Sequence, residues 1–233
     1  MSSYRIAGLL VEMDTFGCTA RQAAPYQTAD AAPDMTVRAE PEVLAQAAQM
    51  GRDYAEYLAT GASFYRQLVR FDGMMLHASC VVVDGRAYLF SAPCGTGKST
   101  HVSLWLREFG DRAYILNDDK PALRFLPDGT LRVFGTPWCG KHGLSRNADA
   151  PLGGIAFLER AEENAIRPMS GKEAVYALMD QTVRKLPGEQ ILQCMELIDR
   201  IVAGGKLWKL SCNMKPAAAR LSYQTMSGKG VLK

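Results

Sequence analysis

The 233-residue sequence lacks a long apolar run, a strong net charge and any closely spaced pair of cysteines. No stretch without Asp, Glu, Lys or Arg exceeds 11 residues, the length of Ala87–Gly97, so we expect no membrane-spanning helix. Lys plus Arg total 27 and Asp plus Glu total 24, and the resulting net charge of +3 is too small to indicate nucleic acid or an anionic membrane as the main partner.

The six cysteines form no C-x-x-C pair, which favours reduced thiols over disulfides or a metal site. The N-terminal apolar run Ile6–Val11 is short and is followed by acidic residues, unlike a signal peptide. We therefore expect a cytoplasmic protein. A hydrophobic content of 48% and the absence of repeats or long linkers predict one globular domain over residues 1–233.

The order of predicted strands and helices indicates an α/β protein. The N-terminal part predicts a strand at 4–12, an irregular connection at 20–38, and helical spacing at 42–69 with an interruption near Gly61. The central part predicts a strand at 74–83, a two-residue turn at Asp84-Gly85 and a return strand at 86–91.

After a glycine-rich loop we expect a helix at 99–109 and a short strand at 113–116, beside the loop. Further elements are predicted as a hairpin (121–126 and 130–134), strands (154–158, 165–168 and 206–211), helices (171–184 and 188–202) and a last helix after 213–216. This order predicts a mixed sheet with helices on its faces and a hairpin leading into the loop.

Residues 92–100 read Ala-Pro-Cys-Gly-Thr-Gly-Lys-Ser-Thr, which matches the phosphate-binding loop (P-loop) pattern G-x-x-x-x-G-K-[ST] except that Ala92 replaces the first glycine. Glycines let backbone N–H groups surround a phosphate chain at a helix N-terminus. In this pattern Lys98 contacts the β and γ phosphates, and the Ser99 hydroxyl binds Mg²⁺. The replacement at Ala92 matters only if the turn needs a positive φ there. We predict ATP and Mg²⁺ as cofactors, with nucleotide contacts from Cys94, Gly95, Thr96, Gly97, Lys98, Ser99 and Thr100.

Two adjacent carboxylates, Asp118 and Asp119, follow the predicted strand 113–116. A phosphoryl-transfer site uses one carboxylate near the metal and one near the attacking hydroxyl. The alternative is that residues 117–121, Asn-Asp-Asp-Lys-Pro, form an ordinary polar turn. The position of the pair directly after a buried strand favours the functional interpretation.

The segment Leu76-His77-Ala78-Ser79, the hairpin turn at Asp84-Gly85, the loop 95–99 and the Asp118-Asp119 pair together resemble the kinase core of HPr kinase/phosphorylase. That core is similar to ATP-dependent phosphoenolpyruvate carboxykinase, whose loop also reads Gly-Thr-Gly-Lys. The resemblance covers residues 74–125 and implies that this segment is the nucleotide-binding core. The chain more closely resembles the short HPr-kinase-related proteins, which include kinases that phosphorylate serine on ribosomal peptides.

The resemblance also implies roles for single residues. Asp118 would be the base for the acceptor hydroxyl, and Asp119 with Ser99 would hold the metal, although the two aspartate roles could be exchanged. His77 falls where the family has a histidine near the acidic pair, so it is a catalytic candidate, with a purely structural role as the alternative. Thr100 departs from the family, because HPr kinases carry an acidic residue after the loop serine.

A second cation is expected at the site, because charge on the transferring group must be neutralised. The segment 135–141 reads Gly-Thr-Pro-Trp-Cys-Gly-Lys and suggests a shaped pocket wall ending in Lys141, the preferred catalytic cation. The alternative is a rigid turn around a buried Trp138. Arg124, Arg146 and Arg160 are weaker candidates for the cation.

These observations predict an ATP- and Mg²⁺-dependent kinase that transfers the γ-phosphoryl group to a hydroxyl, most plausibly a serine of a peptide or protein. A small-molecule kinase on the same core and a nucleotide-binding switch with slow ATPase activity are the alternatives. The expected partners are ATP and the hydroxyl acceptor, without nucleic acid or membrane, and a homo-oligomer is open.

Overall fold

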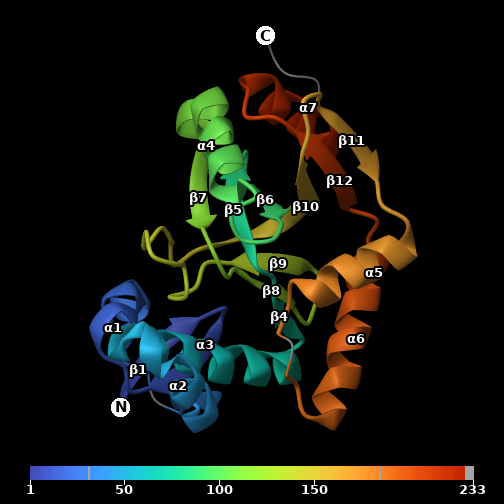
Figure 1. Cartoon of the computed structure of the whole chain (residues 1–233). Helices are drawn as coiled ribbons and strands as arrows, with labels where there is room; N and C mark the ends of the chain where they lie inside the picture. The colour runs from blue at the N-terminus through green and yellow to red at the C-terminus, as the bar shows by residue number, and fades with distance from the viewer. Residues whose placement is uncertain (31, 184, 229–233) are drawn as a thin grey trace.

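A computed structural model describes residues 1–30, 32–183 and 185–228, which form a mixed α/β fold with two β-sheets (Figure 1). The smaller sheet has the order β1-β2-β3, with β1 (Ser2–Ile6), β2 (Leu9–Met13) and β3 (Met35–Val37). In the described residues the larger sheet has nine strands, in the order β4-β8-β9-β10-β6-β5-β7, with β12 paired to both β10 and β11. Its strands are β4 (Gly73–Met75), β5 (Ala78–Val83), β6 (Arg86–Ser91), β7 (Ala113–Asn117), β8 (Ala122–Phe125), β9 (Leu131–Phe134), β10 (Asp149–Arg160), β11 (Ala165–Pro168) and β12 (Leu207–Cys212).

Helices cover both faces of the larger sheet (Figure 1). The helices are α1 (Gly17–Ala23), α2 (Pro41–Ala47), α3 (Arg52–Leu68), α4 (Lys98–Phe109), α5 (Gly171–Asp180), α6 (Gly188–Ala203) and α7 (Pro216–Ser227). Both faces of strand β5 are covered by helices, because all six of its residues are buried and successive side chains point to opposite faces. Val81 packs with α4 and α7, and Val82 packs with α5 and α6. A third core joins the smaller sheet to α3.

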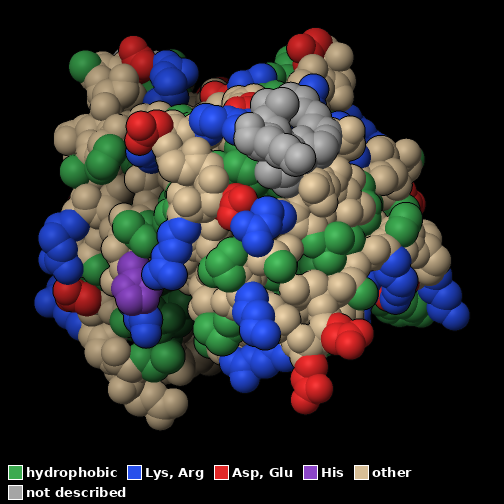
Figure 2. Space-filling view, turned by 90° about the horizontal axis from the view of Figure 1, so that it is seen from above, with side chains coloured by type: hydrophobic (Ala, Val, Ile, Leu, Met, Phe, Trp, Pro, Cys, Tyr) green, Lys and Arg blue, Asp and Glu red, His purple; other side chains and the backbone are tan. Residues whose placement is uncertain are grey.

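Basic and acidic side chains both lie on the face seen from above, where the basic ones are the more numerous (Figure 2). Figure 2 shows Lys and Arg spread over the face seen from above and separated by other side chains, in keeping with the net charge of +3. No helix in the described part of the chain is long and apolar enough to cross a membrane.

The strand directions bring the glycine-rich loop and the acidic pair to the same edge of the sheet. Strand β5 is antiparallel to both β6 and β7, so β6 and β7 run in the same direction. The loop 92–97 follows β6, and Asp118 follows β7. The expectation that the strand at 113–116 lies directly beside the loop is corrected, because β5 separates β7 from β6.

Two predicted strands are each divided in two. The predicted strand 4–12 is a hairpin, because Ala7 (φ 53°) and Gly8 (φ 74°) reverse the chain between β1 and β2. The predicted strand 74–83 separates into β4, which pairs with β8, and β5, which pairs with β6 and β7. Between them the backbone N–H of His77 donates to the carbonyl of Gln181 instead of to a strand.

Other boundaries differ from the sequence expectations at both ends of the chain. The connection expected to be irregular at 20–38 overlaps α1 and contains β3. The predicted helix 171–184 ends at Asp180 as α5, and residue 184 lies outside the described residues.

The expected interruption at Gly61 is wrong, because α3 continues through this residue. The break falls instead at Gly51, whose φ of 91° precedes α3. Gly61 is required by packing, since a Cβ there would lie 2.9 Å from Cδ1 of the Trp138 ring. A glycine in the middle of a helix therefore marks a close approach here and not a helix end.

We expect Gly61→Ala to destabilise the protein by about 1–3 kcal/mol, because the added methyl group overpacks a fully buried indole. Gly188→Ala at the start of α6 is the matched control, since a Cβ there has no neighbour within 4 Å. The control should be neutral or slightly stabilising. Urea unfolding of both variants measures the difference, and equal stabilities would contradict the packing explanation.

Candidate functional site

The loop 92–97, called the glycine-rich loop below, connects β6 to the first turn of α4. Gly95 (φ 78°) and Gly97 (φ 121°) have backbone conformations that other residues rarely adopt. Four non-glycine residues of the described chain have a positive φ, and Ala92 is not among them. The alanine at the first position of the motif therefore causes no backbone strain.

Lys98 lies over the glycine-rich loop rather than in solvent. It is 9% exposed, and its Nζ donates to the Ala92 carbonyl at 2.8 Å. Burial lowers the pKa of Lys98, and the negative charges of Asp119 and Asp118 oppose this effect. The ammonium is thus held at the loop by backbone carbonyls, near the two carboxylates.

Arg160, at the end of β10, braces the same loop from outside. Its Nε donates to the Thr96 carbonyl at 3.1 Å, and its Nη2 donates to the Gly95 carbonyl. These bonds hold the loop carbonyls away from its inner side. Among the three weaker arginine candidates, Arg160 is the one the structure places at the loop.

Ser79 on β5 connects the glycine-rich loop to the acidic pair. Its Oγ lies 3.5 Å from the Oγ of Ser99 and donates to the backbone carbonyl of Asp118 at 3.3 Å. Ser79 itself is fully buried, whereas Ser99 is exposed, so the link leads from the interior of the sheet to the surface of the site. The sequence pattern gave no sign of this role for Ser79, because its two partners come from other segments of the chain.

Asp119 is held by three side chains. Its Oδ1 lies 3.4 Å from His77 Nε2, Lys120 Nζ pairs with its Oδ2, and the Tyr57 hydroxyl donates to Oδ2 at 3.4 Å. Burial raises the pKa of Asp119, but the hydrogen bond from His77 and the charge and hydrogen bond of Lys120 outweigh it and lower the pKa to about 2. Asp119 is therefore a permanent anion at ordinary pH.

Asp118 differs from its neighbour, because its Oδ1 is buried without a hydrogen-bond partner. Such an oxygen is costly unless an incoming group satisfies it. In the described residues no group of three or more His, Cys, Asp or Glu side chains could hold a metal. A divalent cation here would use Ser99 and an aspartate together with oxygens of a bound nucleotide, the arrangement that Mg²⁺ favours.

Asn117 shapes the turn that presents both carboxylates. It is fully buried, and its Oδ1 accepts from the backbone N–H groups of Asp119 (2.9 Å) and Lys120 (2.8 Å). Its Nδ2 donates to the Thr136 carbonyl and hydroxyl. The sequence signal was present, since asparagine commonly bonds the backbone two residues on, but its role was not predicted.

His77 contacts the acidic pair, as expected, through Asp119. Its Nδ1 lies 3.2 Å from Gln181 Oε1, so both ring nitrogens have partners. Of the other candidate residues, Cys94 is exposed, and Thr96, Gly97 and Thr100 line a cavity beside the glycine-rich loop.

The predicted second cation, Lys141, lies at the surface, whereas Trp138 of the same segment is fully buried. Lys141 is exposed and lines a polar cavity of about 340 Å³ with Arg21 and His142. Lys120, which was not proposed as the cation, pairs with Asp119. Trp138 is fully buried and stacks on Phe64 at 4.8 Å, which supports the rigid-turn interpretation of segment 135–141.

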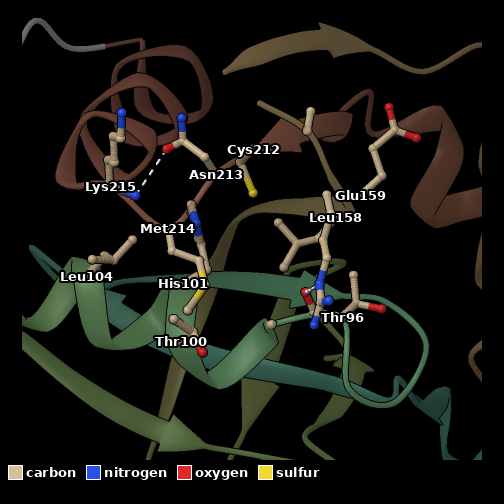
Figure 3. A pocket seen from close by; sticks show the side chains of 13 residues that line it. Thr96, Thr100, His101, Leu104, Leu158, Glu159, Cys212, Asn213, Met214 and Lys215 are labelled. Carbon is tan, nitrogen blue, oxygen red and sulfur yellow. Dashed lines mark hydrogen bonds between the residues drawn. The ribbon is translucent and has the colours of Figure 1, made fainter. Parts of the chain in front are cut away.

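A cavity of about 510 Å³ opens between the glycine-rich loop, α4, β10 and the start of α7. Figure 3 shows Thr96 and Thr100 on one side of it and Asn213, Met214 and Lys215 on another. Its surface is mainly apolar, from side chains such as Leu104 and Leu158.

The polar groups of Asn213 in this cavity are already used. Its Nδ2 donates to the Glu162 carbonyl at 2.8 Å, and its Oδ1 accepts from the Lys215 backbone N–H at 3.0 Å. The residue therefore fixes the wall of the cavity.

The chain is similar to known proteins in sequence and in structure. The family model described as "ScmC: SynChlorMet cassette protein ScmC" matches residues 55–201, which include the glycine-rich loop and the acidic pair. A search of curated proteins found no match. The solved structure of the Hpr(Ser) kinase/phosphatase from Coxiella burnetii matches at 15% identity and a TM-score of 0.30, covering 56% of this chain and 88% of that chain. That TM-score is too low to support a conclusion about this protein.

His101 lines the cavity, and its burial predicts that the folded protein is less stable at acidic pH. Burial lowers its pKa from 6.5 to about 4, so the folded protein keeps it neutral. Between these two pH values the unfolded chain binds a proton that the folded chain does not, and stability falls as the pH decreases. The full effect is about 3 kcal/mol.

Chemical denaturation at pH 7.5, 6, 5 and 4.5 measures this dependence. His101→Gln should be less stable at pH 7.5, because its bonds to Ser222 and Trp105 change, but its stability should fall less steeply with pH. Parallel pH profiles for the two proteins would show that His101 is not the titrating group.

Proposed function

The chain belongs to the ScmC family. We propose that it is an ATP- and Mg²⁺-dependent kinase that phosphorylates a hydroxyl, with a serine of a peptide or protein as the acceptor. One observation supports this most strongly. Lys98 and Ser99, in the first turn of α4 after the glycine-rich loop, lie at the same edge of the sheet as the two carboxylates, and Ser79 links Ser99 to Asp118. A loop pattern alone would support nucleotide binding, whereas the added acidic pair supports transfer.

The glycine-rich loop and α4 would bind the triphosphate. Backbone N–H groups of the loop and the N-terminus of α4 attract anions, and Arg160 occupies the loop carbonyls that would repel them. Lys98 now bonds the Ala92 carbonyl and would turn to the β and γ phosphates. The apolar cavity beside Thr100 is large enough for the base and ribose of the nucleotide.

The two aspartates are suited to different tasks. Asp118 has a buried oxygen without a partner, so it can accept the proton of the acceptor hydroxyl. As the oxygen of the acceptor hydroxyl forms its bond to the γ-phosphorus, the bond from the γ-phosphorus to the β,γ-bridging oxygen would break and ADP would leave. Asp119, whose pKa is about 2, is a weak base and serves better as a fixed anion.

Ser99 and Asp119 are the residues that would hold Mg²⁺ together with nucleotide oxygens. Hydroxyl and carboxylate oxygens fit the preference of this ion, and Asp119 is ionised at all ordinary pH values. When bound, Mg²⁺ would neutralise phosphate charge and orient the leaving group. Lys120, which pairs with Asp119, would supply additional positive charge beside the transferring phosphate.

Mg-ATP binding tests the first half of the proposal. Lys98→Ala should weaken binding about ten- to a hundredfold, since a hydrogen bond to a charged group is lost. Lys172→Ala, an exposed lysine on α5, is the matched control and should bind like the wild type. Isothermal titration calorimetry measures all three proteins. Undiminished binding by Lys98→Ala would overturn the role of the glycine-rich loop.

Phosphoryl transfer tests the second half. Asp118→Asn should bind Mg-ATP normally but transfer phosphate about 10²- to 10⁴-fold more slowly, because the base is lost. Incubation with γ-labelled ATP and serine peptides, followed by phosphoamino-acid analysis, measures the transfer. Phosphate release without a labelled acceptor would favour the nucleotide switch, and a labelled metabolite would favour the small-molecule kinase.

A further inference from the structure

A small cavity, partly open to solvent, lies on the α3 side of the acidic pair. Its volume is about 170 Å³, and it lies between α3, the end of β4 and the turns at 120 and 138. It is lined by Tyr57, Leu58, Gly61, Ala62, Tyr65, Met75, Lys120, Trp138 and Val183. We call it the α3 cavity.

The walls of the α3 cavity are rigid. Trp138 stacks on Phe64 at 4.8 Å and meets Tyr65 edge-on at 5.4 Å between ring centroids. Trp138 is completely buried, and Tyr65 is 1% exposed. Because the packing of these two rings fixes their positions, they give the cavity a preformed inner wall.

The polar ends of its aromatic walls are satisfied within the protein. The Tyr57 hydroxyl bonds Gly140 N–H at 2.9 Å and Asp119, the Tyr65 hydroxyl bonds Thr136 at 2.9 Å, and Trp138 Nε1 donates to Thr60 at 3.2 Å. What the walls present to a ligand is therefore apolar surface. A polar ligand group entering here would lose its hydrogen bonds to water without replacement.

The α3 cavity shares two residues with the acidic pair. Tyr57 and Lys120 line the cavity, and their polar ends hold the Asp119 carboxylate. The Lys120 ammonium lies 5.1 Å from the centre of the Tyr57 ring. A group seated in the cavity would therefore lie on the far side of Tyr57 and Lys120 from the Asp119 carboxylate, next to the acidic pair.

We propose that the α3 cavity binds a bulky apolar side chain, of leucine or phenylalanine size, next to the phosphorylated serine of a peptide acceptor. The inference rests on the proposed kinase function and names its substrate class. Dry apolar cavities of about 150 Å³ bind a benzene-sized molecule, so the space fits one such side chain.

An adjoining apolar surface favours an extended acceptor over a small molecule. Val183 also lines a second cavity, of about 400 Å³, between α5 and α6. Exposed apolar side chains flank it, among them Tyr176 (64% exposed) and Ile191 (49% exposed). An apolar patch of this kind beside a site marks contact with a larger partner. Residues flanking the anchored side chain of a peptide can pack there.

Binding of small probes tests the cavity without any need for catalysis. The probes are N-acetyl-leucinamide and N-acetyl-phenylalaninamide, with N-acetyl-glycinamide as the probe without a side chain. The protein carries ¹³C-methyl methionine, and the signal of Met75 reports on the cavity wall. Wild type and Lys98→Ala should both show a Met75 shift with the two apolar probes and none with the glycine probe.

Ala62→Leu fills the cavity from its partly exposed side and should weaken probe binding at least about tenfold. Ala45→Leu makes the same change at an exposed position of α2 and should bind as the wild type does. Circular dichroism checks that both variants fold. Leu58→Ala enlarges the cavity and should shift the preference toward the phenylalanine probe, which keeps the test valid if Ala62→Leu is unstable.

An array of serine peptides, varied one position at a time and incubated with labelled ATP, tests the substrate class. One position near the serine should prefer large apolar residues by about tenfold or more, and Ala62→Leu should abolish this preference. The proposed cavity function is overturned if the Met75 signal does not shift when the probes are added, or if peptides are phosphorylated without such a preference. Probe binding without phosphorylation of any peptide overturns the kinase proposal instead and leaves the apolar binding site standing.

Discussion

The candidate site depends on the direction of three strands. Strand β5 is antiparallel to β6 and to β7, so the two outer strands end at the same edge of the sheet. The hairpin turn makes β6 run antiparallel to β5. Helix α4 then carries the chain back, so that β7 starts at the same end of the sheet as β6. If β7 ran the other way, Asp118 and Asp119 would lie at the far end of the sheet from Lys98. Buried Ser79 then joins the two parts of the site, because it lies on the strand between them.

The two adjacent aspartates acquire different properties from their surroundings. Asp119 is pinned by His77, Lys120 and Tyr57, and it stays ionised although burial opposes its charge. Charges in a partly buried setting interact more strongly than in water, so few partners suffice. Asp118 retains a buried oxygen without a partner. Two identical side chains in sequence can thus serve as a fixed anion and as a group open to an incoming ligand.

Local patterns predicted the central part of the chain, and tertiary contacts decided the rest. The β5–β6 hairpin, the helix after the glycine-rich loop and the hairpin around 127–129 follow from turn residues and periodicity, and the structure contains all three. Gly61 was misread because the reason for the glycine, the Trp138 ring, is 77 residues away. Lys120 and Asn117 were missed as site residues although each bonds a near neighbour in the chain, because the contacts that hold them in place, with Tyr57 and Thr136, come from distant segments. Asp118 and Asp119 could be chosen as candidate site residues because they directly follow a strand that the local sequence predicts.

The positions of the two cavities bear on the proposed reaction. The larger cavity lies beside α4 and α7, the α3 cavity lies beside α3 and β4, and the acidic pair follows β7 between these regions (Figure 1). Phosphoryl transfer requires the attacking and leaving oxygens to lie roughly in line on opposite sides of the phosphorus. A nucleotide entering from the α4 side and a peptide anchored on the α3 side would approach the carboxylates from opposite directions. Tyr57 and Lys120 both hold Asp119 and line the α3 cavity. An acceptor side chain seated in this cavity would therefore contact the same residues that hold Asp119, and its serine would be directed toward Asp118.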